Sequence, residues 1–225
     1  MLKLKRILYK ISVWFFGLSV GLVVFFKFVP VPFTPLMGIR IIENKLDKKP
    51  IYFEHNWEPI ENISMNLQKA VIASEDGTFL HHHGFDFSAM QKAFQNNASG
   101  KRIKGGSTIS QQTAKNVFLW QGRSYFRKAL EAYFTVLIEL IWGKERIMEV
   151  YLNSIEMGDG IYGAHAATQY WYGKDASSLT KIQAAGIAAI LPNPRKFKAS
   201  NSSAFINRRK ERIVRVMRHI GTIEY

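Results

Sequence analysis

The N-terminal residues 1–33 constrain the chain most, because they contain a long segment without charge. No charged side chain occurs in Ile11–Phe26, and the apolar character resumes after Lys27. A helix needs about 20 apolar residues to cross a bilayer, and Lys27 lies close enough to one end for its ammonium to reach the interface. We therefore predict one transmembrane anchor over residues 11–29.

A cleaved signal peptide is the alternative for this segment. Its apolar part would be about 7–15 residues long, and a small-x-small cleavage site would follow it. The observed run is longer and leads into Phe28-Val29-Pro30-Val31-Pro32, which offers no such site, so an uncleaved anchor is favoured. Four cations lie in residues 1–10, which predicts a cytoplasmic basic N-terminus and places the rest of the chain on the outer side.

Beyond the anchor, residues 30–60 are predicted to be a connector, extended at Pro30, Pro32 and Pro35 and irregular or partly stranded from residue 36. From residue 63 the apolar spacing turns helical, so residues 61–225 are predicted to form a mainly α domain. Further helices are expected at 87–96, 127–142, 144–153, 180–191 and 204–220. The string Gly158–Gly163 matches GxGxxG, but it follows a helix, so no dinucleotide site is predicted. The string Ser178–Lys181 matches SxxK and is interpreted as a helix start, with Thr180 and Gln183 as a capping box.

The charge balance limits the kind of partner. The chain has 31 Lys and Arg against 17 Asp and Glu, a formal charge of +14, which implies nucleic acid, anionic lipid or a phosphate-bearing substrate. There is no cysteine, which excludes a thiolate nucleophile and a cysteine zinc site. The last helix is rich in arginine; a solvated basic face and contact with anionic lipid headgroups are both open there.

The stretch from Ala70 to Asp86 is the first candidate for chemistry. An apolar run leads to adjacent acids, Glu75 and Asp76, and Phe79 and three histidines follow. An apolar approach that ends in carboxylates can carry a general base to the floor of a cleft. The alternative is a helix end followed by a solvated turn with ordinary surface charges. Consecutive histidines point in different directions, so no metal site is expected at residues 81–83.

The second candidate spans Gly105–Asn116. Its two glycines let backbone approach a ligand, and the hydroxyls and free N–H groups at Ser107 and Thr108 suit a helix N-cap or an anion. The alternative is a flexible loop with a simple cap. The preceding loop, residues 99–106, is expected to be mobile because it is polar and contains glycine.

The third candidate lies on the 127–142 helix, which is predicted to be buried nearly all round. Its polar strip contains Arg127, Lys128 and Glu131. A carboxylate on a mostly buried helix needs a partner or a role. An ion pair between Arg127 and Glu131, one turn apart, is the simpler reading. The alternative, functional interpretation is that Glu131 is a second active-site acid beside two cations.

These motifs together resemble the peptidoglycan glycosyltransferase family, in its monofunctional form, over about residues 63–194. The five matching segments are Glu75-Asp76-x-x-Phe79-x-x-His82-x-Gly84, Gly105–Gln112 with Lys115-Asn116, Arg127-Lys128-x-x-Glu131, Arg146-Ile147-x-Glu149-x-Tyr151-Leu152-Asn153, and Ala184-Ala185 through Leu191-Pro192. Five motifs in order are specific where one would be weak. The resemblance implies a mainly α, lysozyme-like catalytic domain with a smaller mobile lobe. It also implies polymerisation of lipid II into β-1,4 glycan strands, with inversion and release of undecaprenyl pyrophosphate.

The resemblance also implies roles. Glu75 would be the catalytic base, and Glu131 would orient cations and act at the donor phosphate as a second catalytic residue. Substrate binding would fall to Asp76, Phe79, His82, Gly106, Ser107, Thr108, Gln111, Gln112, Lys115, Asn116, Arg127 and Lys128. No cofactor is required, although a divalent cation, Mg or Mn, is allowed at the pyrophosphate. The expected partners are lipid II, the growing strand, the membrane and candidate cell-wall synthesis or division proteins, with no nucleic acid. The expected location is the bacterial cytoplasmic (inner) membrane, with the catalytic domain on the periplasmic side.

The residues suit this chemistry independently. A glycosidase must protonate a poor leaving group, whereas a pyrophosphate ester needs cations and donors aimed at the departing oxygens. Lys115, Arg127 and Lys128 supply such cations. The rivals are a lysozyme-like lytic enzyme, which needs no cationic cradle, and a membrane-tethered basic protein without activity.

Overall fold

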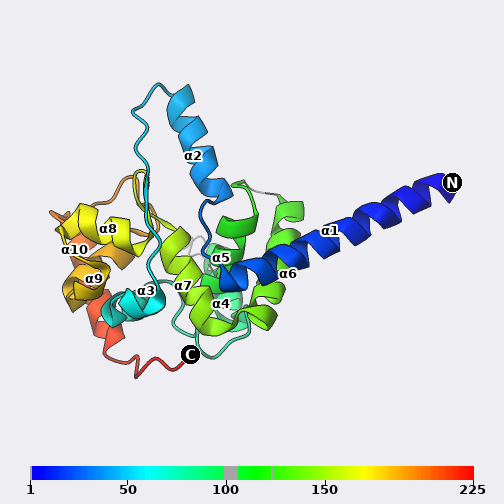
Figure 1. Cartoon of the computed structure of the whole chain (residues 1–225). Coiled ribbons are helices and arrows are strands. Elements are labelled where there is room, and N and C mark those ends of the chain that lie inside the picture. Colours follow the sequence, from blue (N-terminus) through cyan, green and yellow to red (C-terminus); the bar gives the residue numbers. More distant parts are fainter. Residues whose placement is uncertain (1, 99–105, 123) are drawn as a thin grey trace.

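The computed structural model describes residues 2–98, 106–122 and 124–225, and helices make up most of them (Figure 1). The sheet is small and has the strand order β1-β3-β2. Most of the predicted mobile loop, residues 99–105, lies outside the described residues. The mainly α prediction is confirmed.

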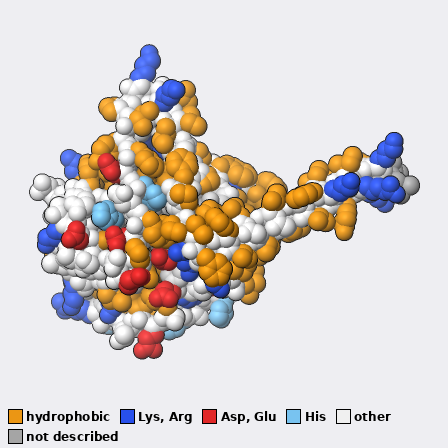
Figure 2. All heavy atoms as spheres, in the orientation of Figure 1, with side chains coloured by type: hydrophobic (Ala, Val, Ile, Leu, Met, Phe, Trp, Pro, Cys, Tyr) orange, Lys and Arg blue, Asp and Glu red, His pale blue; other side chains and the backbone are white. Residues whose placement is uncertain are grey.

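Helix α1 (Leu2–Phe28) projects from the domain as a long rod (Figure 1). It is long and apolar enough to cross a membrane, and only 11% of its most apolar window is buried, which is unlike a core helix. Figure 2 shows apolar side chains along the rod and basic ones at its N-terminal tip. The predicted single N-terminal apolar helix is confirmed, and it begins before residue 11.

The C-terminal half of α1 is fastened to α6 (Tyr125–Ile141) and to the start of α7 (Gly143–Ser154). The hydroxyls of Ser19 and Tyr133 are 2.7 Å apart, and Trp142 Nε1 donates to the Val23 carbonyl at 2.7 Å. The Arg146 guanidinium donates to the carbonyls of Phe26 and Val29, at 2.9 and 2.7 Å. Because these carbonyls are free at the end of a helix, Arg146 caps α1 with a side chain of the domain.

The connector contains a helix that the sequence analysis missed. Thr34 caps α2 (Pro35–Leu46), and Pro35 occupies its first turn, where the missing N–H costs nothing. The prediction of an irregular segment from residue 36 was therefore wrong for α2. The rest fits a partly stranded connector, since it contains β1 (Glu54–His55) and the 3-10 helix η1 (Ile60–Asn62).

Two helical groups form the domain around one core. In the first, α3 (Met65–Glu75) packs against α9 (Lys181–Ile190) and α10 (Ala204–Met217). In the second, α5 (Ile109–Phe118) packs against α6 and α7. Helix α4 (Phe87–Ala98) leads from the first group to α5. The capping box of Thr180 and Gln183 opens α9 as predicted.

The GxGxxG string forms the turn between β2 (Glu156–Gly158) and β3 (Ile161–Tyr162) and the start of α8 (Gly163–Tyr172). β3 pairs antiparallel with β2 and parallel with β1. A Cβ on Gly160, which has φ +73°, would lie 2.1 Å from the Tyr52 carbonyl oxygen. Close backbone packing therefore accounts for this glycine. The short 3-10 helix η2 (Ala176–Ser178) follows α8.

Helix α6 is less buried than the sequence predicted. Phe126 is 67% exposed and Leu140 is 78% exposed, and Tyr125 and Val136 are also exposed. The prediction of a helix buried nearly all round was wrong, because an apolar stripe does not reveal whether it faces a core or another apolar medium. The exposed side chains leave an apolar face on the helix that α1 contacts.

Candidate active site

Glu75 is the last residue of α3 and lines a groove of about 870 Å³. Its side chain is 16% exposed. Ser74 Oγ donates to Glu75 Oε1 at 3.0 Å, and Arg209 Nη2 lies 3.7 Å from the same oxygen. The other oxygen, Oε2, accepts from Gln112 Nε2 at 3.4 Å. The carboxylate is thus held in place but still open to the groove, as a base must be.

A buried tyrosine fixes the orientation of Gln112. The Tyr151 hydroxyl donates to Gln112 Oε1 at 3.3 Å, which leaves the amide nitrogen directed at Glu75. Burial raises the pKa of Tyr151 well above its usual value, and the negative charges of Glu75 and Asp76 raise it further. Tyr151 therefore remains a hydrogen-bond donor across the working pH range. The sequence analysis placed Tyr151 in the fourth motif but gave it no role in the site.

Asp76 turns away from the groove and joins α3 to α5. Its carboxylate accepts from the Ile109 backbone N–H at 2.9 Å, at the positive end of α5, and from His82 Nε2 at 2.9 Å. The Gly84 N–H donates to His82 Nδ1 at 3.0 Å, so the proton of a neutral His82 is on Nε2. Phe79 is fully buried beneath the Lys144 ammonium. Asp76, Phe79 and His82 thus brace the site from inside, and their predicted contact with substrate stays a prediction.

The glycine-containing motif opens α5 with a capping box. The Gln111 N–H donates to Thr108 Oγ1 at 3.2 Å, and the Thr108 N–H donates to Gln111 Oε1 at 3.1 Å. The hydroxyl of Thr108 also donates to the Gly84 carbonyl at 2.7 Å. The predicted N-cap is confirmed, and it occupies two of the predicted substrate-binding side chains.

Three side chains of the second motif line the groove: Ser107, Gln112 and Lys115. Gly106 packs against α4, where a Cβ would lie 3.3 Å from both Ala93 and Met90. Asn116 is buried on α5. Of this motif, therefore, the structure brings three predicted side chains to the groove of Glu75. Gln111 caps α5 and also lines an adjoining pocket, and the other predicted residues build the helix and its packing.

Glu131 lies beneath the cations of α6. Its carboxylate is 4% exposed and accepts from Arg127 Nη1 at 2.7 Å and from Lys128 Nζ at 2.5 Å. Both oxygens are thus occupied by cations, and Lys128, 46% exposed, extends outward. The predicted ion pair is confirmed, and it includes Lys128 as well. This geometry suits a residue that orients cations better than one that transfers protons.

Lys115 lines the groove of Glu75 and also lies within electrostatic range of Arg127 and Lys128. Burial lowers the pKa of its ammonium; Glu131 opposes this effect, and Arg127 and Lys128 add to it. A cation that is desolvated beside two others gains strongly from a bound anion. The side of the groove that Lys115 lines therefore favours the binding of phosphate oxygens.

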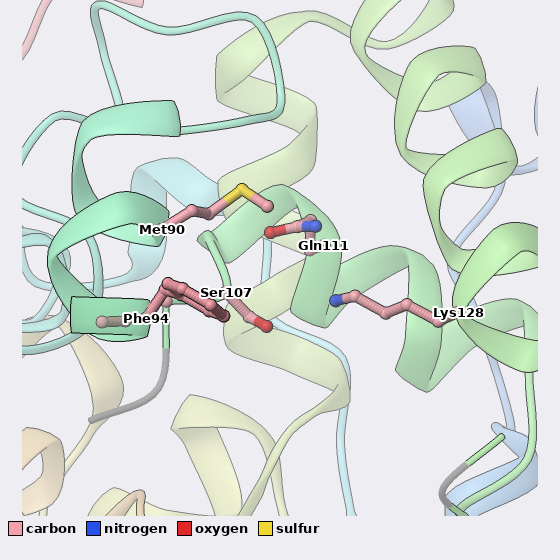
Figure 3. A pocket seen from close by; sticks show the side chains of 7 residues that line it. Met90, Phe94, Ser107, Gln111 and Lys128 are labelled. Atoms are coloured by element: carbon pink, nitrogen blue, oxygen red, sulfur yellow. The ribbon is translucent and has the colours of Figure 1, made fainter. Parts of the chain in front are cut away.

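A smaller pocket of about 260 Å³ adjoins the groove at Ser107, which lines both. Figure 3 shows Ser107 and Gln111 between the apolar side chains of Met90 and Phe94 and the ammonium of Lys128. Glu75 and Lys128 are thus on connected surfaces. A ligand with phosphate oxygens and an apolar chain could contact both the cations and the apolar side chains where the groove and the pocket meet.

The chain matches the family model described as Transglycosylase over residues 44–218. This match covers most of the chain, including all five sequence motifs and every residue of the candidate active site described above. The chain belongs to the transglycosylase family.

Relatives of this transglycosylase match over nearly the whole chain. A protein of Caulobacter vibrioides is 55% identical over 191 residues, which are 85% of this chain and 81% of the relative. One of Pseudomonas syringae pv. syringae is 50% identical over 99% of this chain and 94% of the relative. One of Bdellovibrio bacteriovorus is 49% identical over 94% of this chain and 84% of the relative. Each is named biosynthetic peptidoglycan transglycosylase.

Proposed function

We propose that this transglycosylase polymerises lipid II into β-1,4-linked peptidoglycan strands and releases undecaprenyl pyrophosphate. The observation that carries the proposal is that Glu75 and Lys115 line one groove and Lys128 lines the pocket that adjoins it. The names of the relatives supply the substrate class.

In the proposed reaction Glu75 accepts the proton of the acceptor sugar's 4-hydroxyl, and that oxygen attacks the anomeric carbon of the growing strand. The bond from this carbon to the pyrophosphate oxygen breaks as the new bond forms on the opposite face, so an α-linked donor gives a β link. Gln112 and Ser74 hold the base in position. The leaving group needs no proton donor, because a diphosphate is a stable anion.

Cations would stabilise the charge that develops on the pyrophosphate. Lys115 and Lys128 are placed to contact its oxygens, with Arg127 and Glu131 fixing the position of Lys128. Such preorganised charges cost no reorganisation during the reaction. Among the described residues no cluster of three His, Asp or Glu side chains could hold a metal ion, and both oxygens of Glu131 are taken. The divalent cation allowed by the sequence therefore stays a prediction, and no step is derived through it.

The membrane arrangement supports a lipid-linked substrate. Helix α1 provides the anchor, and the exposed apolar side chains of Phe126 and Leu140 lie on α6, which α1 contacts. Phe94 on α4 is also exposed, beside the pocket that contains Lys128. We propose that these faces enter the outer leaflet, with the N-terminus cytoplasmic and the domain periplasmic, so that the prenyl chains stay in the bilayer during transfer.

The test offers the purified full-length protein labelled lipid II in one reaction and finished cell-wall glycan in another. Polymer from lipid II with no fragments from glycan is expected. Fragments from glycan without polymer would establish the lytic rival, and neither product would favour a binding protein.

A further inference from the structure

The groove that contains Glu75 continues beyond the reaction centre to one face of α10. Phe205, Ile213 and Val216 supply the apolar part of this wall, and three arginines supply its charge: Arg208, Arg209 and Arg212. Ile206, Ile213 and Met217 are buried and fasten the helix to the domain. The arginine face is therefore part of a fixed wall.

Two of the three arginines on this wall have no counter-charge among the described residues. Arg209 is engaged by Ser74 and Glu75. Arg208 and Arg212 are exposed and form no ion pair with any described residue. They lie four residues apart, on the same side of the helix and about 6 Å apart along its axis. Apart from Glu75, the described residues that line the groove include no carboxylate. The part of the wall formed by Arg208 and Arg212 is thus complementary to an anion that the residues described in the structure do not supply.

Membrane phosphate is out of reach for these arginines. Figure 1 shows α10 on the side of the domain away from α1, with α5, α6 and α7 between them. Attraction to anionic headgroups fades within about 10 Å at physiological salt, so a surface across the domain is screened from the membrane. The pyrophosphate is expected on the Lys115 side of the groove. Of the anionic partners in the proposed reaction, the glycan polymer is the one left to meet α10.

We propose that Arg208 and Arg212 bind the carboxylates of the stem peptides on the glycan strand that occupies this groove. This inference rests on the proposed function. Every second sugar of a peptidoglycan strand carries a peptide with free carboxyl groups, and the guanidinium group pairs well with carboxylates. The contact recurs with each repeat, so it holds the strand beside Glu75 while the next lipid II enters.

The experiment compares lipid II with free stem carboxyl groups against lipid II whose stem carboxyl groups are amidated. The variant is Arg208→Gln/Arg212→Gln. The matched control is Arg215→Gln/Arg218→Gln, which removes the same charge from exposed positions of the same chain segment outside the groove. The readouts are product length and the ratio of kcat/KM for the free-acid substrate to that for the amidated one.

The groove variant should lower this ratio about threefold to tenfold and shorten the free-acid products, since each partly exposed ion pair changes an equilibrium up to about fivefold. The control should keep the wild-type ratio. An unchanged ratio in the groove variant, or an equal fall in the control, would overturn the inference. Loss of binding to vesicles of anionic lipid at an unchanged ratio would overturn it in favour of headgroup contact. Failure of the wild-type protein to polymerise either substrate would refute the proposed function, and this inference with it.

Discussion

Replacing Glu131 with glutamine tests whether this carboxylate positions cations or takes part in the chemistry. The substitution keeps the shape but leaves Arg127, only 10% exposed, without its counter-charge. Removing one partner of a buried ion pair costs about 3–5 kcal/mol, and we expect the lower end because Lys128 is half exposed and an amide still accepts one hydrogen bond. At about 2–4 °C per kcal/mol for a domain of this size, Tm should fall by about 6–12 °C.

The activity of the same variant should fall by about 100-fold, because the cations at the pyrophosphate lose their fixed geometry. Thermal unfolding in detergent and polymerisation of labelled lipid II measure the two effects. The matched control is Glu139→Gln, another buried carboxylate of α6, which is paired with Lys144 and Ser110 outside the groove. It should lose similar stability and keep its rate per folded molecule. Loss of activity in Glu131→Gln with no change in Tm would refute the positioning role.

Three further predictions concern the frame and the charge of the site. Gly84→Ala should lower the free energy of unfolding by about 1–3 kcal/mol and leave the rate per folded molecule unchanged. The reason is that Gly84 has φ +88° and a Cβ there would lie 2.8 Å from Thr135 Cγ2. Equal Tm values for the variant and the wild type would contradict this. Tyr151→Phe should reduce kcat about threefold to tenfold, since Gln112 loses the donor that orients it, and an unchanged kcat would remove Tyr151 from the site. The pKa of Lys115 is lowered and its cationic form binds phosphate, so kcat/KM should fall on the alkaline side at a pH below the usual lysine range. In Lys115→Arg this fall should move to higher pH, because arginine stays charged. Coincident pH profiles of the two proteins would exclude Lys115 as the titrating group.

The helices could be predicted because their signals are local. The N-cap at Ser107 and Thr108, the capping box at Thr180 and the apolar spacing after residue 63 marked helices that the structure contains. Helix α2 was missed because the prolines just before it and at its start favoured an extended chain, although Thr34-Pro35 and the apolar residues between Leu36 and Leu46 are a helix signal. The exposed face of α6 was misjudged because apolar side chains look alike whether they face a core or the outside.

Residues of the candidate site could be predicted where they lie within a sequence motif, but not where packing of distant elements brings them together. Glu75, Lys115 and Lys128 were identified from their segments, and the structure brings them to connected surfaces. Arg209 was not, because it comes from a helix that looked like a generic basic face and reaches Glu75 only through packing of α10 on α3. Asp76 was predicted to bind substrate, but the change of backbone direction at the end of α3 turns its carboxylate toward the start of α5.

The most direct test of the account is the polymerisation rate of Glu75→Gln on lipid II, measured together with its Tm. Glutamine keeps the size, and with its oxygen toward Gln112 and its NH2 toward Ser74 Oγ it can bond to both neighbours, but it cannot accept the acceptor's proton. The account predicts a fall of at least about 100-fold, the usual contribution of a general base, at nearly unchanged Tm. A folded variant that still polymerises lipid II within a few-fold of the wild-type rate would contradict it.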